Sequence, residues 1–344
     1  MKNTFSAIVL FTILVLTASC ASNEEPKPDT GKLISLGAVV PNGPKEASST
    51  TTTASIQEFT VYAFTGGNVL MDGVKVVRDG GSWTYSPDAY WPVTPVNFYA
   101  YSPEIATTTS INQSEGDIPA YLNQGDVDLL YSVQKDVMQQ PAPVSLNFRH
   151  ALSKVSVMLS SNNPRIRVMV SYVCISNLYQ QGSFQFPQSS TLATMPDVVG
   201  SWSDLKSKAT MITFAVIGYD DQVELTPQPT DLTVNTLNHS FVIPQPLANV
   251  SLSESGYSGN YIEVDCEIFD VATGAKLWPN SHTPDYMLVP HTQTGRIIYK
   301  ITSDNINAFL PGHAYIYNIS IDNPSVLDKI EFNPTVDEYS IDEM

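Results

Sequence analysis

Residues 144–159 alternate apolar and polar side chains and change phase once, and this change constrains the fold more than any other feature of the chain. The first half has the period of a strand with one buried face, through Val144, Leu146 and Phe148. The second half keeps the period in the opposite phase, through Val155, Val157 and Leu159. Because a shift of one residue turns the apolar set to the other face of a sheet, the sequence predicts a bulge or kink between Ala151 and Lys154. Such a strand would form the seam between two β-domains.

The rest of the chain has the composition of many short strands joined by turns. Only 15% of the residues are charged, and 24 prolines and 18 glycines are spread along the sequence without any long helical period. A length of 344 residues allows two domains at the usual ~100–200 residues each. The sequence therefore predicts an all-β fold of two sandwiches. The net charge of −17 disfavours nucleic acid and anionic lipid as partners.

Residues 1–19 have the features of a signal peptide. Lys2 supplies a positive charge, and Phe5–Leu16 is an apolar run too short to span a bilayer. The residues LTASC that end at Cys20 resemble a bacterial lipoprotein box, which implies acylation of Cys20, with palmitate, and anchoring in the outer membrane. The following Asn-Glu-Glu resembles an export signal of surface lipoproteins. An ordinary secretory signal with an incidental cysteine is the alternative.

A tether and then a strand follow the anchor. Residues 20–32 are polar and contain proline, whereas Leu33–Val40 alternates as a strand does. The inward face of this strand would carry Ile34, Leu36, Ala38 and Val40. Residues 41–55 are a polar loop with Lys45 as their sole basic residue, and such a loop is a natural site of proteolytic nicking.

Two cysteines remain after the anchor. Unbroken alternation places Cys174 on one strand face with Ile166, Val168, Val170 and Tyr172. It places Cys266 on one face with Ile262, Val264 and Ile268. Both side chains would then point into a core as small hydrophobes. They could pair in an oxidising compartment, which spacing does not decide, and two free buried thiols are the favoured interpretation.

Several short sequence blocks follow one another along the chain. They are Phe59–Phe64 (FTVYAF), Tyr90–Pro92 with Asn97–Pro103 (YWP and NFYAYSP), Asp128–Tyr131 (DLLY), Phe148–Val155 (FRHALSKV) and Pro311–Tyr317 (PGHAYIY). As a set, these blocks resemble the signature of the fimbrillin (Mfa-like) family, whose members build the lipoprotein-derived pili of Bacteroidales. The resemblance covers nearly the whole mature chain.

The resemblance implies two tandem transthyretin-like β-sandwiches, here at residues 33–161 and 162–344. In stalk subunits, it further implies that an outer-membrane protease removes the first strand and that a strand from a neighbouring subunit fills the groove. The removable segment of this chain would be residues 33–55. The four inward side chains of its strand would contribute at most roughly 6–10 kcal/mol of apolar burial.

Two features bear on that assembly. The family protease commonly cuts after Arg, and the first Arg of this chain is Arg78, so cleavage after Lys45 is the hypothesis. If the strand stays in place, the chain would be a terminal or anchoring subunit. Residues 325–344 are the candidate donor tail, with Ile330, Phe332 and Val336 alternating, although Pro334 limits pairing. A closing hairpin on the second sandwich is the equal alternative for this tail.

Catalysis has little support in the sequence. The five histidines show none of the short spacings of a zinc site, so no enzyme activity, metal or cofactor is expected. His150 is expected to be a hydrogen-bonded structural residue, and Asp126 and Asp128 to be turn residues. Two functions remain open. The first is a fimbrial subunit that binds other fimbrillin subunits and supports adhesion to host or bacterial surface ligands. The second is a monomeric surface lipoprotein that binds glycans through exposed aromatic side chains.

Overall fold

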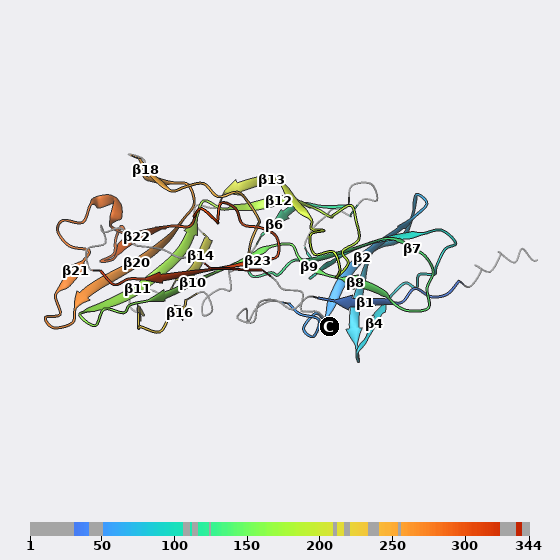
Figure 1. The fold of residues 1–344 in the computed structure, drawn as a ribbon, viewed down its shortest axis with the longest axis horizontal. Coiled ribbons are helices and arrows are strands. Elements are labelled where there is room, and N and C mark those ends of the chain that lie inside the picture. Colours follow the sequence, from blue (N-terminus) through green and yellow to red (C-terminus); the bar gives the residue numbers. More distant parts are fainter. Residues whose placement is uncertain are drawn as a thin grey trace, which may run out of the picture.

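The computed structural model describes residues 31–40, 51–105, 111, 116–123, 125–208, 212–216, 221–232, 241–253, 256–323 and 335–338. Strands dominate these ranges, and their one helical element is the 3-10 helix η1 (Asp285–Met287). The all-β fold class is therefore confirmed. The molecule is elongated, with earlier strands such as β2 and β7 at one end and later strands such as β20 and β21 at the other (Figure 1). The division into two transthyretin-like sandwiches stays a prediction.

A six-stranded sheet forms the N-terminal end. Its order is β4-β3-β2-β5-β7-β9, with bounds β2 (Glu58–Thr65), β3 (Asn68–Asp79), β4 (Ser82–Tyr85), β5 (Val96–Ser102), β7 (Leu130–Val137) and β9 (Arg149–His150). β3 and β4 form a hairpin, and its turn uses Gly80 and Gly81 at φ +53° and +92°, where glycine is favoured. The central strands β2 and β5 are buried on both faces, which requires a layer on each side.

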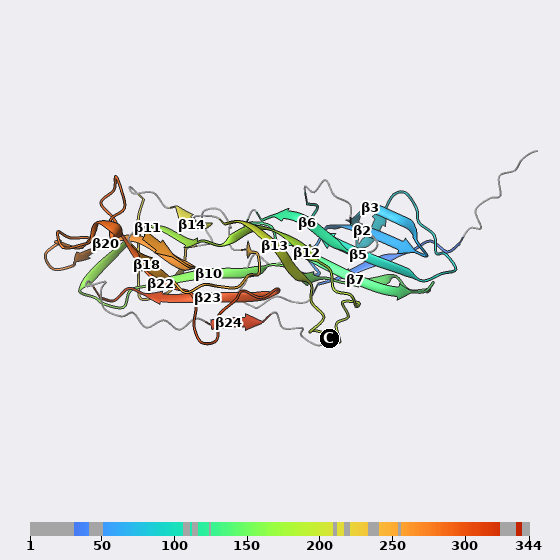
Figure 2. The same ribbon diagram turned by 90° about the horizontal axis from the view of Figure 1, so that it is seen from above.

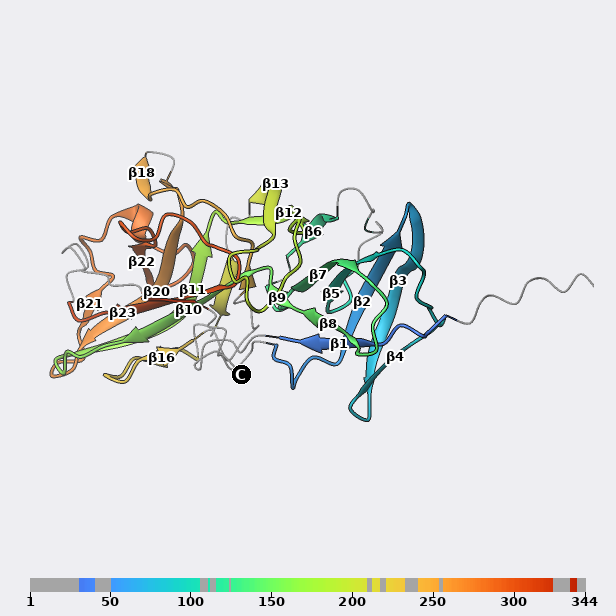
Figure 3. The same ribbon diagram turned by 45° about the vertical axis from the view of Figure 1, so that its right-hand side comes forward.

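The first layer is a parallel pair, β1 (Leu36–Val39) and β8 (Val144–Asn147), which lie side by side in Figure 3. It covers one face of the six-stranded sheet and shares a core with it. The fully buried members of this core include Ile34, Ile56, Phe59, Phe98, Leu146 and Phe148. The β1 strand therefore helps to cover the N-terminal core.

The second layer comes from residues far along the chain. A three-stranded sheet, in the order β13-β12-β6, contains β6 (Asp117–Leu122), β12 (Tyr179–Gln185) and β13 (Ser201–Lys208), and lies near the middle of the molecule (Figure 2). With the face of β2, β5 and β7 that lies opposite β1 and β8, it forms a second core, which we call the middle core. The buried members include Tyr62, Phe64, Tyr99, Tyr131, Phe184 and Phe186. Strands β12 and β13, which lie beyond the predicted domain boundary at residue 161, thus cover the second face of the N-terminal sheet.

Two sheets form the C-terminal end. One sheet, of five strands, has the order β16-β10-β23-β24 with β17 also paired to β10. The other, of six strands, has the order β14-β11-β20-β21 with β15 paired to β11 and β22 paired to β20. Their bounds are β10 (Ser153–Ser160), β11 (Ile166–Ser176), β14 (Ile212–Val216), β15 (Val223–Glu224), β16 (Thr230–Asp231), β17 (Phe241–Val242), β20 (Tyr261–Asp270), β21 (Lys276–Trp278), β22 (Gly295–Lys300), β23 (His313–Ser320) and β24 (Thr335–Glu338). A small hairpin, β18 (Ser251–Ser253) with β19 (Gly256–Ser258), projects beside them.

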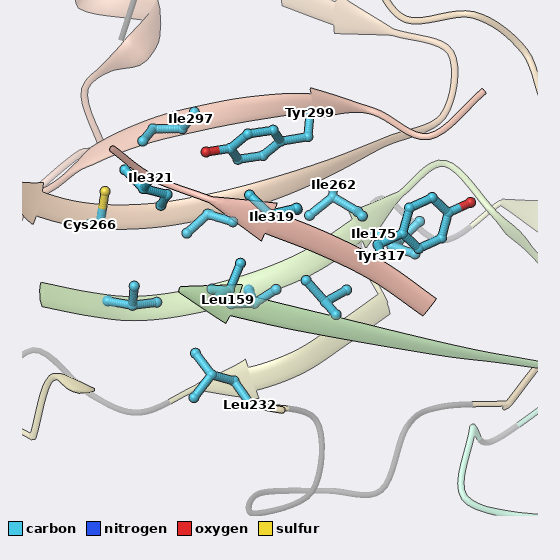
Figure 4. Close-up of a cluster of buried hydrophobic side chains, with 14 of the residues drawn as sticks. Leu159, Ile175, Leu232, Ile262, Cys266, Ile297, Tyr299, Tyr317, Ile319 and Ile321 are labelled. Carbon is cyan, nitrogen blue, oxygen red and sulfur yellow. The ribbon is translucent and has the colours of Figure 1, made fainter. Parts of the chain in front are cut away.

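The C-terminal core lies between these two sheets. Figure 4 shows side chains from β10 and β23 facing those from β11, β20 and β22, including Leu159, Ile319, Ile175, Ile262 and Ile297. Each of these is at most 2% exposed. This core shares no residue with the cores of the N-terminal end, so each end of the molecule has a separate apolar interior.

The seam strand breaks where the change of phase predicts. β9 ends at His150 and pairs with β7, whereas β10 begins at Ser153 and runs parallel to β23 in the C-terminal sheet. Ala151 and Leu152 lie between them and are buried in the middle core. The domain boundary at residues 161 and 162 stays a prediction, and the strand pairing favours a boundary nearer Ala151.

Alternation fails for one cysteine. A register shift in the pairing of β11 with β20, between Val170 and Tyr172, moves the later residues of β11 to the opposite phase. Cys266 lies in the C-terminal core as expected, but Cys174 does not, because Val173 and Ile175 take the inward positions. Both thiols are free and buried.

Candidate functional site

The β1 strand is short and pairs with a single strand among the described residues. Leu36–Val39 runs parallel to Val144–Asn147, with Leu36 opposite Val144 and Val39 opposite Asn147. The side chains of Ile34, Leu36 and Val40 are 0%, 4% and 2% exposed, and Ala38 packs against the same core. All the inward positions expected from the sequence therefore contact the N-terminal core.

The backbone groups of β1 point in two directions, as those of a parallel strand must. Ser35 O accepts from the Val144 amide at 2.8 Å, and Val39 O accepts from the Phe148 amide at 2.7 Å. Odd-numbered residues of the segment therefore bond to β8. The N–H and C=O groups of the even-numbered residues face away from β8, toward whatever lies along the other edge of β1.

Two hydroxyl groups hold that other edge at its ends. The Tyr85 hydroxyl donates to Ile34 O at 2.6 Å, while the Ile34 amide donates to Ala89 O at 2.9 Å. Six residues later, the Val40 amide donates to Thr53 Oγ1, and the Thr53 hydroxyl donates to Val40 O, both at 2.8 Å. These contacts involve only the main chain of the strand. They would therefore accept another strand of different sequence.

Thr53 belongs to a segment with attachments of its own. The Thr51 amide donates to Asp128 Oδ2 at 2.7 Å, and Arg78 Nη1 donates to the carbonyl oxygens of Thr53 and Ala54 at 3.1 and 3.2 Å. Ile56 is 2% exposed in the same core as β1. Residues 51–56 are thus held to the rest of the molecule by contacts that do not involve β1.

Asp128 joins this segment to the seam. Its Oδ1 lies 2.8 Å from Nδ1 of His150, and both side chains are at most 5% exposed. His150 is therefore a hydrogen-bonded structural residue, as expected. Asp128 is not a simple turn residue, because its carboxylate is buried and connects Thr51 with β9. The sequence offered no signal for this pairing, since the two side chains are brought together only by the fold.

The other residues singled out in the sequence are placed as follows. Cys20, Lys45, Ile330 and Phe332 lie outside the described residues. Val336 lies in β24, which pairs antiparallel with β23 and places Val336 opposite Tyr315. In a single chain, this part of the tail therefore closes the C-terminal sheet. Its role as a donor strand remains a prediction, as do the lipidation, the processing site and the removal of β1.

A second polar cluster lies on the outer face of β20 and β22. Glu263 and Asp265 are each 4% exposed, and Nε of Arg296 lies 3.5 Å from Oε1 of Glu263. Burial, reinforced by the negative charge of Glu263, raises the pKa of Asp265 to about 7. Burial also raises the pKa of Glu263, against the opposing effect of Arg296. One cation therefore faces two buried carboxyl groups.

Two further features bear on function. In the ranges that the structure describes, no three His, Cys, Asp or Glu side chains are arranged to hold a metal ion. The same ranges contain no helix with the length and apolar content that a membrane span requires.

The fold and sequence are similar to those of known proteins. The model of the fimbrillin-like family matches residues 46–338. A fimbrial protein from Bacteroides vulgatus ATCC 8482 is similar in structure, with a TM-score of 0.55, 12% identity and coverage of 89% of this chain and 99% of the other. A protein from Parabacteroides distasonis ATCC 8503 that is provisionally assigned to cell adhesion has a TM-score of 0.50, 10% identity and coverage of 90% and 96%. A fimbrilin from Porphyromonas gingivalis W83 has a TM-score of 0.46, 11% identity and coverage of 90% and 97%. No curated protein sequence matches the chain.

Proposed function

Because the chain belongs to the fimbrillin-like family, we propose that it is a structural subunit of a fimbria, exported as an outer-membrane lipoprotein and assembled by strand exchange. The observation that carries this proposal is the pairing of β1. Its four inward positions face a core, yet only β8 pairs with it among the described strands. A strand of this kind can be replaced by another without disturbing the six-stranded sheet.

The energetics support replacement rather than simple loss. The three fully buried side chains of the β1 segment, at ~1.5–3 kcal/mol each, contribute at most roughly 5–9 kcal/mol. Removal of the segment would expose neighbouring side chains of that core, including Leu146 and Phe148, to water. A vacated groove would therefore be unstable, and a strand from another copy would restore both the burial and the hydrogen bonds to β8.

The N-terminal sequence supports the route to the cell surface. Acylation of Cys20 would anchor the chain in the outer membrane, with residues 20–32 as a tether to β1. Cleavage after Lys45 would separate this anchor and β1 from the remainder. The remainder would keep Thr51–Ile56, which have their own attachments to Asp128 and Arg78. Without cleavage, the chain would be a terminal or anchoring subunit of the fimbria.

A monomeric glycan-binding lipoprotein is the second candidate. Most aromatic residues of the N-terminal blocks do not favour it, because Tyr62, Tyr99 and Tyr101 are 4–6% exposed, whereas Tyr90 is 45% exposed. One group of tyrosines does favour it. Tyr257 and Tyr286 lie 6.2 Å apart at the C-terminal end, and Tyr286 is 46% exposed, so a sugar ring could stack there.

Mild trypsin treatment of the purified full chain, followed by size analysis and N-terminal sequencing, separates the two candidates. A fimbrial subunit is expected to lose residues up to Lys45 and to form a ladder of multimers. Fibres on the cell surface should also disappear when the gene is deleted. A chain that stays monomeric after cleavage and retains affinity for a glycan would overturn the proposal.

A further inference from the structure

We propose that one end of the molecule, which we call the N-terminal tip, contacts the lipid bilayer while the chain is anchored through Cys20. The N-terminal tip comprises residues 31–35, 65–69, 86–95 and 138–143, all of which the structure describes. This inference rests on the proposed acylation of Cys20 and adds a non-covalent contact between the folded chain and the same bilayer.

Hydrogen bonds join these four segments. The Trp91 amide donates to Lys32 O at 3.0 Å, and Lys32 Nζ donates to Gln140 O at 3.1 Å. The hydroxyl oxygens of Thr65 and Thr94 lie 2.5 Å apart, which connects the turn between β2 and β3 to the same group. The N-terminal tip is therefore one region of the surface, at the end of the molecule remote from β20 and β21 (Figure 1).

Large apolar side chains are exposed on this tip. They are 42–94% exposed and belong to Leu33, Val69, Tyr90, Val93 and Met138. Leu33 and Tyr90 form a β-bridge, so their side chains point to the same side of the local sheet. A single exposed apolar side chain needs no explanation, but five of them on adjoining segments indicate a contact surface.

The N-terminal tip also differs in charge from the rest of the chain. Its four segments contain two charged residues, Lys32 and Asp88, whose charges cancel. Lys135 and Asp136, in the last part of β7, cancel in the same way. The net charge of −17 therefore comes from other parts of the chain. An anionic bilayer surface, which repels the protein as a whole, does not repel this tip.

The place where the anchored segment joins the fold identifies the bilayer as the occupant. Leu33 follows Cys20 by 13 residues, which span at most about 45 Å when extended. Acyl chains on Cys20 would therefore keep the N-terminal tip within this distance of the bilayer. Such a tether gives an effective concentration on the order of millimolar, so a surface of weak intrinsic affinity is sufficient. Tyrosine and aliphatic side chains are well suited to the bilayer interface.

This contact would orient the chain on the membrane. β1 runs from the N-terminal tip toward the middle of the molecule (Figure 1). Val40 follows Leu33 by seven residues, up to about 23 Å of extended chain. The loop that contains Lys45 starts after Val40, so the proposed processing site would begin on the side of the strand remote from the lipid.

Fluorescence quenching by lipid tests the contact. The lipidated full chain carrying Val93→Cys is labelled with an environment-sensitive dye and reconstituted into vesicles of phosphatidylethanolamine and phosphatidylglycerol, with or without spin-labelled lipid. Val271→Cys is the matched control, because Val271 is an exposed valine between β20 and β21. Cys174 and Cys266 are buried and do not take the dye. Spin-labelled lipid should quench the dye at residue 93 at least about fivefold more than the dye at residue 271.

Loss of apolar side chains should release the tip but not the chain. In the labelled Val93→Cys chain, Tyr90→Ser combined with Met138→Gln should lower the ratio of quenched to unquenched dye about tenfold, because both substitutions remove apolar contact with lipid. Flotation of the chain with the vesicles should stay unchanged. Because both side chains are about half exposed, the midpoint of urea unfolding should also stay unchanged.

The other outcomes separate this inference from the proposed anchor. Equal quenching at residues 93 and 271 overturns the contact and leaves the lipid anchor intact. Shielding of the dye at residue 93 that increases with protein concentration and does not respond to spin-labelled lipid assigns the tip to a second copy, and also overturns the contact. A chain that does not float with the vesicles overturns the acylation of Cys20, and this inference with it.

Discussion

Replacement of Asp265 by asparagine is expected to remove a pH dependence from the stability of the C-terminal end. Asp265 and Glu263 are both buried on β20, and Arg296 is near Glu263. Burial and the charge of Glu263 raise the pKa of Asp265 to about 7, whereas an unfolded chain leaves an aspartate near ~4. The folded protein therefore binds a proton between these two pKa values that the unfolded chain has already released.

The sign follows from this difference in bound protons. Where the folded state binds more protons than the unfolded state, the free energy of unfolding falls as pH rises. The contribution of Asp265 is thus fully present below about pH 4 and is lost as pH rises through about pH 7. Three pKa units correspond to about 4 kcal/mol in total, of which roughly 2–3 kcal/mol is lost between pH 5 and pH 8. Asparagine carries no charge at any pH and avoids this loss.

Urea unfolding of the full chain, followed at about pH 5 and about pH 8, measures the effect. Asp265→Asn should gain roughly 2–3 kcal/mol relative to the unsubstituted chain as pH rises over that interval. Asp304→Asn, at an exposed aspartate, changes the net charge equally and serves as the matched control. A difference between Asp265→Asn and the unsubstituted chain that is the same at both pH values would refute the assignment of a raised pKa to Asp265.

Two further substitutions and one chemical modification also have defined expected outcomes. Leu36→Ala should destabilise the N-terminal end by about 2–4 kcal/mol, because its side chain is 4% exposed in the core, and the midpoint of urea unfolding measures this. Gly200→Ala should destabilise by about 1–3 kcal/mol or force Phe184 to move, since a Cβ at residue 200 would lie 2.2 Å from Cζ of Phe184, and thermal melting reports it. Cys174 and Cys266 should resist alkylation in the folded protein at pH 8 and react after unfolding, as mass spectrometry will show, because burial raises the pKa of both thiols, that of Cys174 to about 12.

Local sequence patterns predict much of the observed fold. Alternation predicts the strands around the seam, and the change of phase predicts the break that lies at Ala151 and Leu152 between β9 and β10. These predictions succeed because the period of a strand depends only on neighbouring residues. The same reasoning fails for Cys174, because the register shift before Tyr172 interrupts the period and leaves no mark in composition. A bulge within a strand rich in β-branched residues gives no turn signal.

The packing of strands that are distant in the sequence could not be predicted in the same way. Nothing in the sequence of β12 and β13 indicates that they cover the N-terminal sheet, because an alternating strand does not specify which sheet it packs against. The two hydroxyl contacts at the ends of the β1 segment could not be predicted either. Tyr85 had the appearance of an ordinary strand residue and Thr53 that of a loop residue, and both act through main-chain atoms that any sequence presents.

The middle core joins the two ends of the molecule across the break at Ala151 and Leu152. Phe184 of β12 contacts Tyr131 of β7 at a ring distance of 4.6 Å, and the indole of Trp202 on β13 donates to Ala151 O at 2.7 Å. These contacts cross the break between β9 and β10, so the two ends of the molecule cannot turn independently about Ala151 without exposing apolar surface. The strand β1, which packs on the N-terminal core, is therefore held at a constant position relative to the C-terminal sheet of the same chain. If subunits are joined by exchanged strands, as proposed above, this constant position would give the fibre a regular repeat.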